Sequence, residues 1–320
     1  MVDAHYDLLT ICYVCYLKND YTKIMEISKE IATSGVKSIF ANLYFMTKEE
    51  MRDELGKYYF QENISVLEMF QISKNILENY LPNVNFVYSI EGCDYVGLED
   101  LDDLYKEGLR SVIPVWNHEN QYGSGNRTGA GLTDLGVSFL EKAIDLGFGI
   151  DLSHANERTF YGMIDVIRMK QFQGKDVICY ASHSNARSLC DRARNLKDEQ
   201  LLAIKSVGGL VGLLSNRNFV TMDVGIDKES QKREYLKHIK YVAGIVGKDK
   251  VMVSTDDMRF YDEVDPVYLE LPIYDYSNIG TDLERTLLQG FSKDETEAIL
   301  YGNVQDQIIR KLIMNKFIRG

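Results

Sequence analysis

Proline, tryptophan and long apolar runs are scarce in this sequence. Its 320 residues include four prolines and one tryptophan. No stretch approaches the run of about 20 apolar residues that a membrane-spanning helix needs. The first residues also lack the basic and apolar segments of a signal peptide. We therefore expect neither a leader nor a membrane partner.

Cysteine is used sparingly and without a regular pattern. The five cysteines stand at irregular spacings: Cys12, Cys15, Cys93, Cys179 and Cys190. Cys12 and Cys15 have the spacing of a redox motif, but they lie in an apolar run without a thioredoxin-like context. We interpret them as buried thiols rather than as a redox pair. Because unpaired thiols suit a reducing compartment, we expect a cytoplasmic location.

Basic residues are fewer than acidic residues in this chain. The chain has 36 basic and 48 acidic residues, which gives a formal net charge of −12. This balance argues against nucleic acid or an anionic membrane surface as a partner, because both attract basic proteins. Hydrophobic residues make up 45% of the chain, enough for a full core, and no linker interrupts it. We expect one domain over residues 1–320.

Short apolar segments alternate with helical patterns along the whole chain. The predicted strands are residues 2–8, 37–44, 85–90, 111–116, 149–153, 177–182, 209–214 and 251–255. The clearest helical patterns are residues 21–33, 66–79, 133–146, 157–170, 198–206 and 232–246. Eight such strands predict a (β/α)8 TIM barrel. A doubly wound open sheet is the alternative, although no G-x-G-x-x-G motif follows the first strand.

A glycine-rich run covers residues 123–129, with the sequence Gly-Ser-Gly-Asn-Arg-Thr-Gly. Its glycines do not have the spacing of a nucleotide-binding motif. We interpret the run as a mobile loop over the mouth of the barrel, with a phosphate cradle as the less favoured alternative.

Residues that can bind metals or transfer protons occur where the predicted strands end. They are His5 and Asp7, Glu91, His154, His183 and Asp256. In a barrel the chemistry takes place at the C-terminal ends of the strands. His5 and Asp7 are two residues apart, so both would leave the same face of the first strand. Three imidazoles and two carboxylates from four strands suit one or two zinc ions.

The order of these motifs is similar to that of a known family. The matching pieces are Asp3-Ala-His-Tyr-Asp7, Ile90-Glu-Gly92, Asp151-Leu-Ser-His154, Ser182-His-Ser-Asn-Ala186 and Arg192-Ala-Arg-Asn195, with weaker matches at residues 238–244 and at Gly302-Asn303. With them the chain resembles the membrane dipeptidase (renal dipeptidase) family, the M19 metallopeptidases, whose barrels are similar to those of amidohydrolases. The resemblance runs from Asp3 to about Asn303.

The resemblance implies a binuclear zinc site that hydrolyses dipeptides. His5 and Asp7 would bind the first zinc ion, His154 and His183 the second, and Glu91 would bridge the two. The nucleophile would be a hydroxide between the metals. The family also implies substrates that often carry a D-residue at the C-terminal position, and a homodimer as the assembly.

Two further residues take their expected roles from the same resemblance. Arg194 matches the arginine that binds the free carboxylate of the substrate, and a guanidinium fork suits that group. Asp256 matches the acid of strand eight that handles the proton. Arg192 is the alternative to Arg194 as the carboxylate binder.

The chain departs from the family at strands four and eight. Many members carry a histidine at the end of strand four, where this chain has Trp116. Asn117 or His118 could supply the missing donor to the reacting oxygen, and the alternative for His118 is a surface loop residue. After strand eight the family usually shows Gly-Asp-Phe-Asp-Gly, whereas this chain has Thr255-Asp-Asp-Met-Arg259.

Several polar residues near these motifs have structural interpretations. We expect His238 to be structural and Asp257 to be a loop or cap residue. Residues 217–219, Arg-Asn-Phe, follow strand seven and are candidates to line the pocket.

Two other functions remain open from the sequence. The altered loops fit a metal-dependent hydrolase of another small amide, a lactone or a phosphoester. Trp116 fits a degenerate barrel that binds a metal or a dipeptide without turnover. The complete set of ligand candidates argues against that degenerate barrel.

Overall fold

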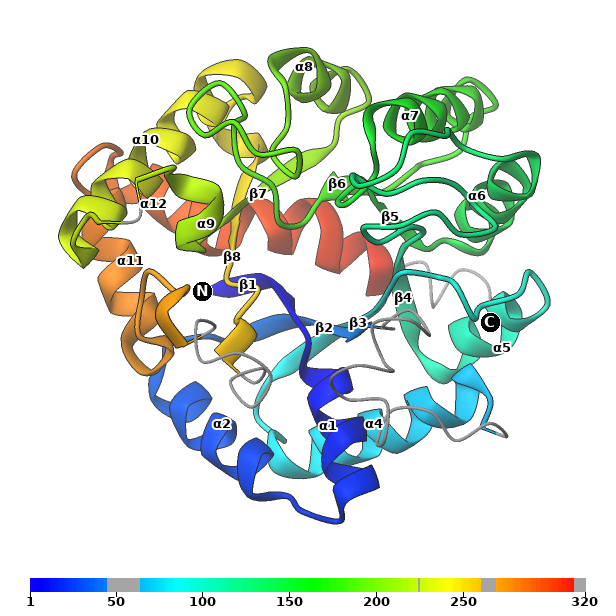
Figure 1. The fold of residues 1–320 in the computed structure, drawn as a ribbon, viewed down its shortest axis with the longest axis horizontal. Helices are drawn as coiled ribbons and strands as arrows, with labels where there is room; N and C mark the ends of the chain where they lie inside the picture. The colour runs from blue at the N-terminus through cyan, green and yellow to red at the C-terminus, as the bar shows by residue number, and fades with distance from the viewer. Residues whose placement is uncertain (45–63, 224, 260–268, 314–320) are drawn as a thin grey trace.

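Eight parallel strands lie beside one another in chain order in the computed structural model (Figure 1). They are β1 (Val2–Tyr6), β2 (Ser38–Tyr44), β3 (Asn85–Glu91), β4 (Leu109–Ile113), β5 (Gly149–Asp151), β6 (Cys179–Ala181), β7 (Leu210–Leu214) and β8 (Val251–Ser254). The structure describes residues 1–44, 64–223, 225–259 and 269–313.

The sheet curves round so that its last strand returns to its first. The backbone N–H of Asp256 donates to the His5 carbonyl over 3.0 Å, and that of Thr255 donates to the Asp3 carboxylate over 2.9 Å. Asp3 also accepts from the hydroxyls of Thr255 and Tyr276. The (β/α)8 barrel is therefore confirmed, and the open doubly wound sheet was the wrong alternative.

Helices surround the strands (Figure 1). They are α1 (Leu8–Lys18), α2 (Thr22–Thr33), α4 (Val66–Tyr80), α5 (Asp100–Glu107), α6 (Asp134–Leu146), α7 (Glu157–Phe172), α8 (Asp198–Ser206), α9 (Arg217–Val220), α10 (Lys228–Val246), α11 (Ile279–Leu287) and α12 (Lys293–Glu297). Local chemistry sets several of their ends. The side chains of Ser65, Thr133 and Asn156 cap α4, α6 and α7. Gly147 ends α6 in a left-handed conformation.

Most of the predicted strands are shorter in the structure than the sequence indicated. The first ends at Tyr6, because α1 begins at Leu8. The fourth ends at Ile113 rather than at residue 116. The sequence did not predict α1, since nearly all of its residues are buried and it has no polar face to give a helical period. Cys12 and Cys15 lie buried in this helix, as expected.

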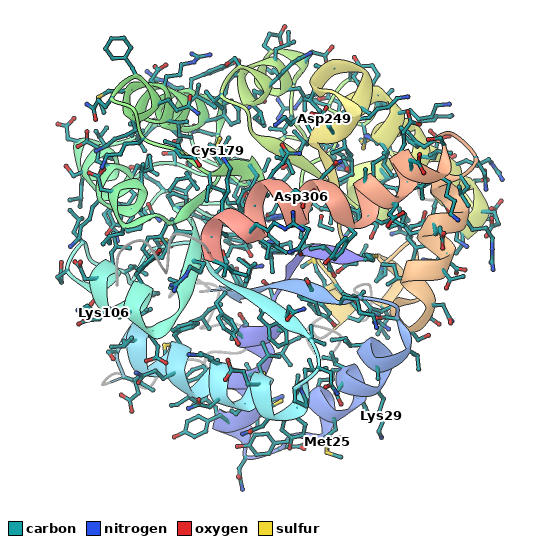
Figure 2. The ribbon with its side chains drawn as sticks, turned by 180° about the vertical axis from the view of Figure 1, so that it is seen from behind. Met25, Lys29, Lys106, Cys179, Asp249 and Asp306 are labelled. Atoms are coloured by element: carbon teal, nitrogen blue, oxygen red, sulfur yellow. The ribbon has the colours of Figure 1, made fainter. Side chains whose placement is uncertain are left out.

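The C-terminal helix closes one end of the barrel. It begins as α12 and continues through π-helical segments at Ala298–Gly302 and Gln305–Ile309. Figure 2, seen from behind, shows it crossing in front of the strands. Its buried face packs against Ile178, which directly precedes β6, and against apolar side chains from six strands: Val2, Ala4, Phe40, Val87, Tyr180, Leu210 and Met252.

No helix in the described part of the chain has both the length and the apolar character to cross a membrane.

Candidate active site

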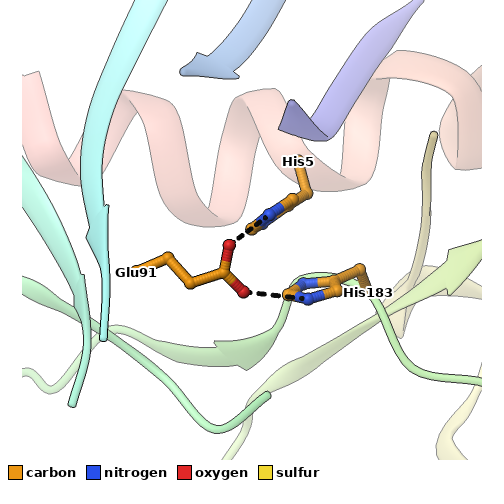
Figure 3. Close-up of side chains that lie close together, drawn as sticks. All are labelled: His5, Glu91 and His183. Carbon is orange, nitrogen blue, oxygen red and sulfur yellow. Dashed lines mark hydrogen bonds and ion pairs between the residues drawn. The ribbon is translucent and has the colours of Figure 1, made fainter. Parts of the chain in front are cut away.

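The residues predicted as metal ligands converge at the C-terminal ends of the strands. His5 lies in β1 and Glu91 is the last residue of β3. His154 follows β5 and His183 follows β6. All four are buried, with at most 8% of any of them exposed. Figure 3 shows Glu91 between His5 and His183.

The two carboxylate oxygens of Glu91 face different histidines. Oε2 lies 3.1 Å from His5 Nε2. Oε1 lies 2.6 Å from His154 Nε2 and 3.4 Å from His183 Nε2. The carboxylate therefore stands between one histidine on one side and two on the other.

Two further carboxylates approach His5 from neighbouring loops. Asp7 Oδ1 lies 3.6 Å and Asp256 Oδ1 lies 3.8 Å from His5 Nε2. Asp7 stands after β1, just before α1, so it reaches His5 from the loop and not from the strand face that the sequence suggested. The ligand atoms form two overlapping groups: His5, Glu91 and His183, and His5, Asp7 and Asp256.

The donor set fits a metal ion such as zinc. The Nε2 atoms of His154 and His183 lie only 2.9 Å apart, and both face the same oxygen of Glu91. Neutral imidazoles whose ring nitrogens converge on one carboxylate match zinc coordination by nitrogen and oxygen. Both histidines are held in the neutral state. Burial lowers the pKa of His154 to about 4, and burial and the charge of His5 lower that of His183 well below its usual value.

The pKa values of His5 and of the nearby carboxylates depend on burial and on each other's charge. Burial raises the pKa of Asp256 to about 7, and the charges of Asp7 and Glu91 add to this effect. Burial opposes ionisation of Glu91, but His5 and His154 still hold its pKa well below the usual value. Burial likewise opposes protonation of His5, while Glu91 and the other carboxylates raise its pKa. This concentration of buried negative charge favours a bound cation.

Backbone strain is concentrated at two of these residues. His154 has a φ of 68° and Asp256 a φ of 44°. Residues other than glycine rarely adopt this left-handed region, and such strain is typical of functional sites. Both residues lie in the short segments that follow β5 and β8, and both side chains belong to the cluster.

Sequence reasoning missed two polar partners of the histidines and one residue behind them. The Asn42 amide nitrogen lies 3.1 Å from His5 Nδ1. The Ser182 hydroxyl oxygen lies 2.6 Å from His183 Nδ1 and 3.3 Å from His5 Nδ1. The Asn126 amide donates to Asn117 Oδ1, which in turn lies 3.0 Å from His154 Nδ1. The available signals were a polar residue inside the apolar segment of β2 and a serine directly before a candidate ligand.

Arg194 lies beside the cluster, in the loop after β6. Its guanidinium donates to the His183 carbonyl over 3.2 Å and to the Ser184 hydroxyl over 3.4 Å, and both partners are neutral. It lines a small pocket together with His154 and Asn126. Arg192 instead donates to the Asn218 carbonyl of α9, so the structure places Arg194 nearer to the ligand candidates.

Two residues of the loop after β4, Trp116 and Asn117, lie beside His154. The Trp116 ring lies 6.0 Å from the His154 ring and 4.8 Å from that of Tyr44. Asn117 Oδ1 lies 3.0 Å from His154 Nδ1. The ring of His118 lies 5.8 Å from Trp116. Asn117 thus points its oxygen at a candidate ligand histidine, whereas the sequence suggested a donor to the reacting oxygen.

The remaining candidates occupy structural positions. His238 accepts from the Ala186 N–H and donates to the Val220 carbonyl, so it is structural as expected. Asp257 is paired with Arg259. Residues 217–219 lie in α9. They are not among the residues that line the pocket beside Arg194.

Known proteins share both the sequence pattern and the architecture. The family model described as membrane dipeptidase (peptidase family M19) matches residues 1–312. An uncharacterized protein in the pqqA 5′ region of Klebsiella pneumoniae is 34% identical over 165 residues, which cover 49% of this chain and 58% of that relative. The match thus spans little more than half of the relative's length.

Solved structures of metallopeptidases have the same fold. A metallo peptidase from Rhodobacter sphaeroides, liganded with a phosphinate mimic of the dipeptide L-Ala-D-Ala, has a TM-score of 0.70 at 21% identity, with 94% of this chain and 96% of that chain covered. A dipeptidase of family M19 has a TM-score of 0.72 at 21% identity, with 97% and 98% covered. Because the family model spans nearly the whole chain, the protein belongs to the membrane dipeptidase family, peptidase family M19.

Proposed function

We propose that this metal-dependent dipeptidase is a binuclear zinc enzyme. One observation carries the proposal: the two oxygens of Glu91 face His5 on one side and both His154 and His183 on the other. A carboxylate in this position can bridge two metal ions. His5 and Asp7 would hold the first zinc ion, and His154 and His183 the second.

The chain's own residues would bind the substrate and move the proton. Two zinc ions, when bound, acidify water and polarise a carbonyl group. Arg194 would bind the free C-terminal carboxylate of a dipeptide, because its guanidinium lines the pocket beside His154. Asp256 would take and return the proton, since its carboxyl lies 3.8 Å from His5 and burial raises its pKa toward neutrality.

We propose dipeptides with a D-residue at the C-terminal position as one substrate class. The support is that the Rhodobacter sphaeroides metallo peptidase binds a mimic of L-Ala-D-Ala and shares this fold. A homodimer and a cytoplasmic location remain predictions. Five unpaired cysteines, all buried, support a reducing compartment.

Metal analysis and a dipeptide panel test the proposed function together. Protein purified without chelator should hold about two zinc ions per chain and should hydrolyse L,L or L,D dipeptides. Fewer than about one zinc ion per chain, with no gain on adding zinc, would contradict the binuclear site. Activity on lactones or phosphoesters without any on dipeptides would indicate a hydrolase of another bond.

Replacement of Arg194 tests the carboxylate clamp. Arg194→Ala should raise KM for dipeptides, and Arg194→Lys should restore binding only in part, because an ammonium lacks the two-pronged fork. Dipeptide amides should be poor substrates of the wild type and should be affected far less by the substitution. Arg192→Ala is the matched control, since Arg192 bonds to α9. Equal wild-type rates on a dipeptide and its amide would remove the clamp.

A further inference from the structure

Asn117 lies between the metal-site histidine His154 and the glycine-rich loop. Its Oδ1 lies 3.0 Å from His154 Nδ1, and it also accepts a hydrogen bond from Asn126 Nδ2 over 2.6 Å. Asn117 is 8% exposed, so water competes little for these bonds. One oxygen therefore joins a residue of the loop to a candidate zinc ligand.

The hydrogen bond specifies which nitrogen of His154 carries the proton. An amide oxygen accepts, so the ring must donate from Nδ1, and its Nε2 lone pair is then left for a metal. Nε2 is the atom that lies 2.6 Å from Glu91 and 2.9 Å from His183 Nε2. The hydrogen bond to Asn117 therefore selects the tautomer of His154 that a metal ion at Nε2 would need.

The three histidines are held in different ways. His5 lies within β1, and the ring of His183 has the hydroxyl of the preceding Ser182 as a partner. His154 lies beyond the end of β5 and has a φ of 68°. Its Nδ1 partner comes instead from a different part of the barrel, after β4.

The glycine-rich loop is itself fixed against the end of β4. Gly125 N–H donates to the His118 carbonyl over 2.8 Å, and Arg127 N–H donates to the Asn117 carbonyl over 2.9 Å. A side chain at Gly125 would collide with the carbonyl oxygen of Trp116, so this close approach requires glycine. The loop that the sequence suggested as mobile is thus anchored, and Asn126 is held where it meets Asn117.

We propose that Asn117 and Asn126 are positioning residues that lock His154 with its proton on Nδ1 and so set the affinity for the second zinc ion. The glycine-rich run is then a support of the metal site rather than a phosphate cradle. This inference rests on the proposed binuclear site. It goes beyond that site because it assigns a function to a loop that holds none of the ligands.

Three substitutions test the positioning role through metal affinity. Asn117→Leu keeps the size of the side chain but removes the acceptor. It should raise the Kd of the second zinc ion by about 10–100-fold, the usual effect of losing a partner of a metal-binding histidine. Asn117→Asp keeps an acceptor oxygen and should stay near wild type. Asn126→Ala should have a smaller effect, because Asn117 keeps its own bond to His154. Competition with a chromophoric chelator measures each Kd.

Asn120→Leu is the matched control. Asn120 belongs to the same loop region, and its amide donates to the Pro114 carbonyl over 2.9 Å and accepts from the Tyr122 N–H over 2.9 Å. None of its hydrogen bonds reaches a candidate ligand. This variant should lower the Tm while leaving both zinc affinities unchanged.

A second readout reports the tautomer directly. NMR of isotope-labelled histidine in the zinc-loaded protein should show His154 with a proton on Nδ1, and Asn117→Leu should weaken or lose that signal. A wild type that binds two zinc ions together with an Asn117→Leu variant of equal affinity would overturn the positioning role alone. A wild type without zinc would overturn the proposed function and the inference with it.

Discussion

The two ends of the barrel are built from opposite kinds of side chain. At the closed end, the C-terminal helix buries Val304, Ile308, Ile309 and Leu312 against apolar residues of the strands. At the mouth, the strands end in buried histidines and carboxylates that lie within hydrogen-bonding distance of each other. The same barrel therefore has a hydrophobic cluster at one end and a cluster of ionisable groups at the other.

This difference indicates that the closed end mainly stabilises the fold, whereas the mouth carries the candidate site. Burial of apolar surface stabilises the closed end. At the mouth, burial raises the pKa of Asp256 to about 7, and His154 and Asp256 both have a positive φ. Such features cost stability and persist where the surrounding structure holds them. We expect substitutions at the mouth to change metal binding and turnover, and substitutions at the closed end to change stability alone.

The largest effect should come from Glu91→Gln. A neutral amide cannot offset two divalent charges, so the variant should lose most of its zinc and about 10³-fold or more in turnover, which corresponds to about 4 kcal/mol. Elemental analysis and dipeptide kinetics measure the two losses. Glu78→Gln is the control, because Glu78 accepts a hydrogen bond from Tyr88 away from the cluster. Two retained zinc ions with near-normal turnover would exclude Glu91 as the bridge.

Replacement of Asp256 should separate turnover from metal binding. Asp256→Asn should keep zinc nearly intact but lower kcat by about 10²–10⁴-fold, the usual range for a general acid or base. Asp257→Asn is the neighbouring control, since Asp257 is paired with Arg259. A large loss of kcat in Asp257→Asn, with only a mild loss in Asp256→Asn, would assign the proton transfer to Asp257 instead.

Although Asp256→Asn should lower kcat, it should increase the free energy of unfolding of the metal-free protein. The folded pKa of Asp256, about 7, lies above its unfolded value of 3.8, so its ionisation destabilises the fold as pH rises through this range. Metal-free Asp256→Asn should therefore unfold at a higher urea concentration than metal-free wild type at about pH 8.

At the closed end, Ile308→Ala should lower the free energy of unfolding by about 2–5 kcal/mol, because it leaves a cavity in a fully buried contact. Zinc content and kcat should stay at wild-type values. Ile313→Ala on the same helix is the control, since Ile313 is 52% exposed. A loss of zinc from Ile308→Ala without unfolding would show that the two ends are coupled.

The smallest expected effect concerns His238, which lies outside both ends. Burial lowers its folded pKa from 6.5 to about 4, so it stabilises the fold above pH 6.5 and loses this contribution as pH falls toward 4. Between pH 7 and pH 5 the loss should be about 2 kcal/mol. Urea titrations of wild type and His238→Gln should therefore converge at the lower pH. Parallel pH curves would show that His238 is not held neutral.

The sequence predicted the mouth better than the closed end. Ligand candidates such as Glu91 and His183 could be found because a barrel places the ends of its strands together. The C-terminal helix was not predicted as the closure, although Val304, Ile308 and Leu312 have helical spacing. Spacing indicates that a helix has a buried face, but it does not indicate which surface that face covers.

Contacts between distant loops also lay beyond the sequence. The bonds from Asn126 to Asn117 and from Asn117 to His154 join the loop after β4 to the loop after β5, and no pattern in the sequence pairs these three residues. The approach of Asp7 to His5 from the start of α1 likewise depends on where β1 ends. These positions follow from how the loops pack on the barrel rather than from any local pattern.

Anomalous X-ray diffraction at the zinc edge, on crystals grown without chelator, tests the central claim most directly. We predict two peaks about 3.5–4 Å apart, one on each side of the Glu91 carboxylate, with the second beside His154 and His183. A single peak, or peaks away from Glu91, would contradict a binuclear zinc site bridged by this residue.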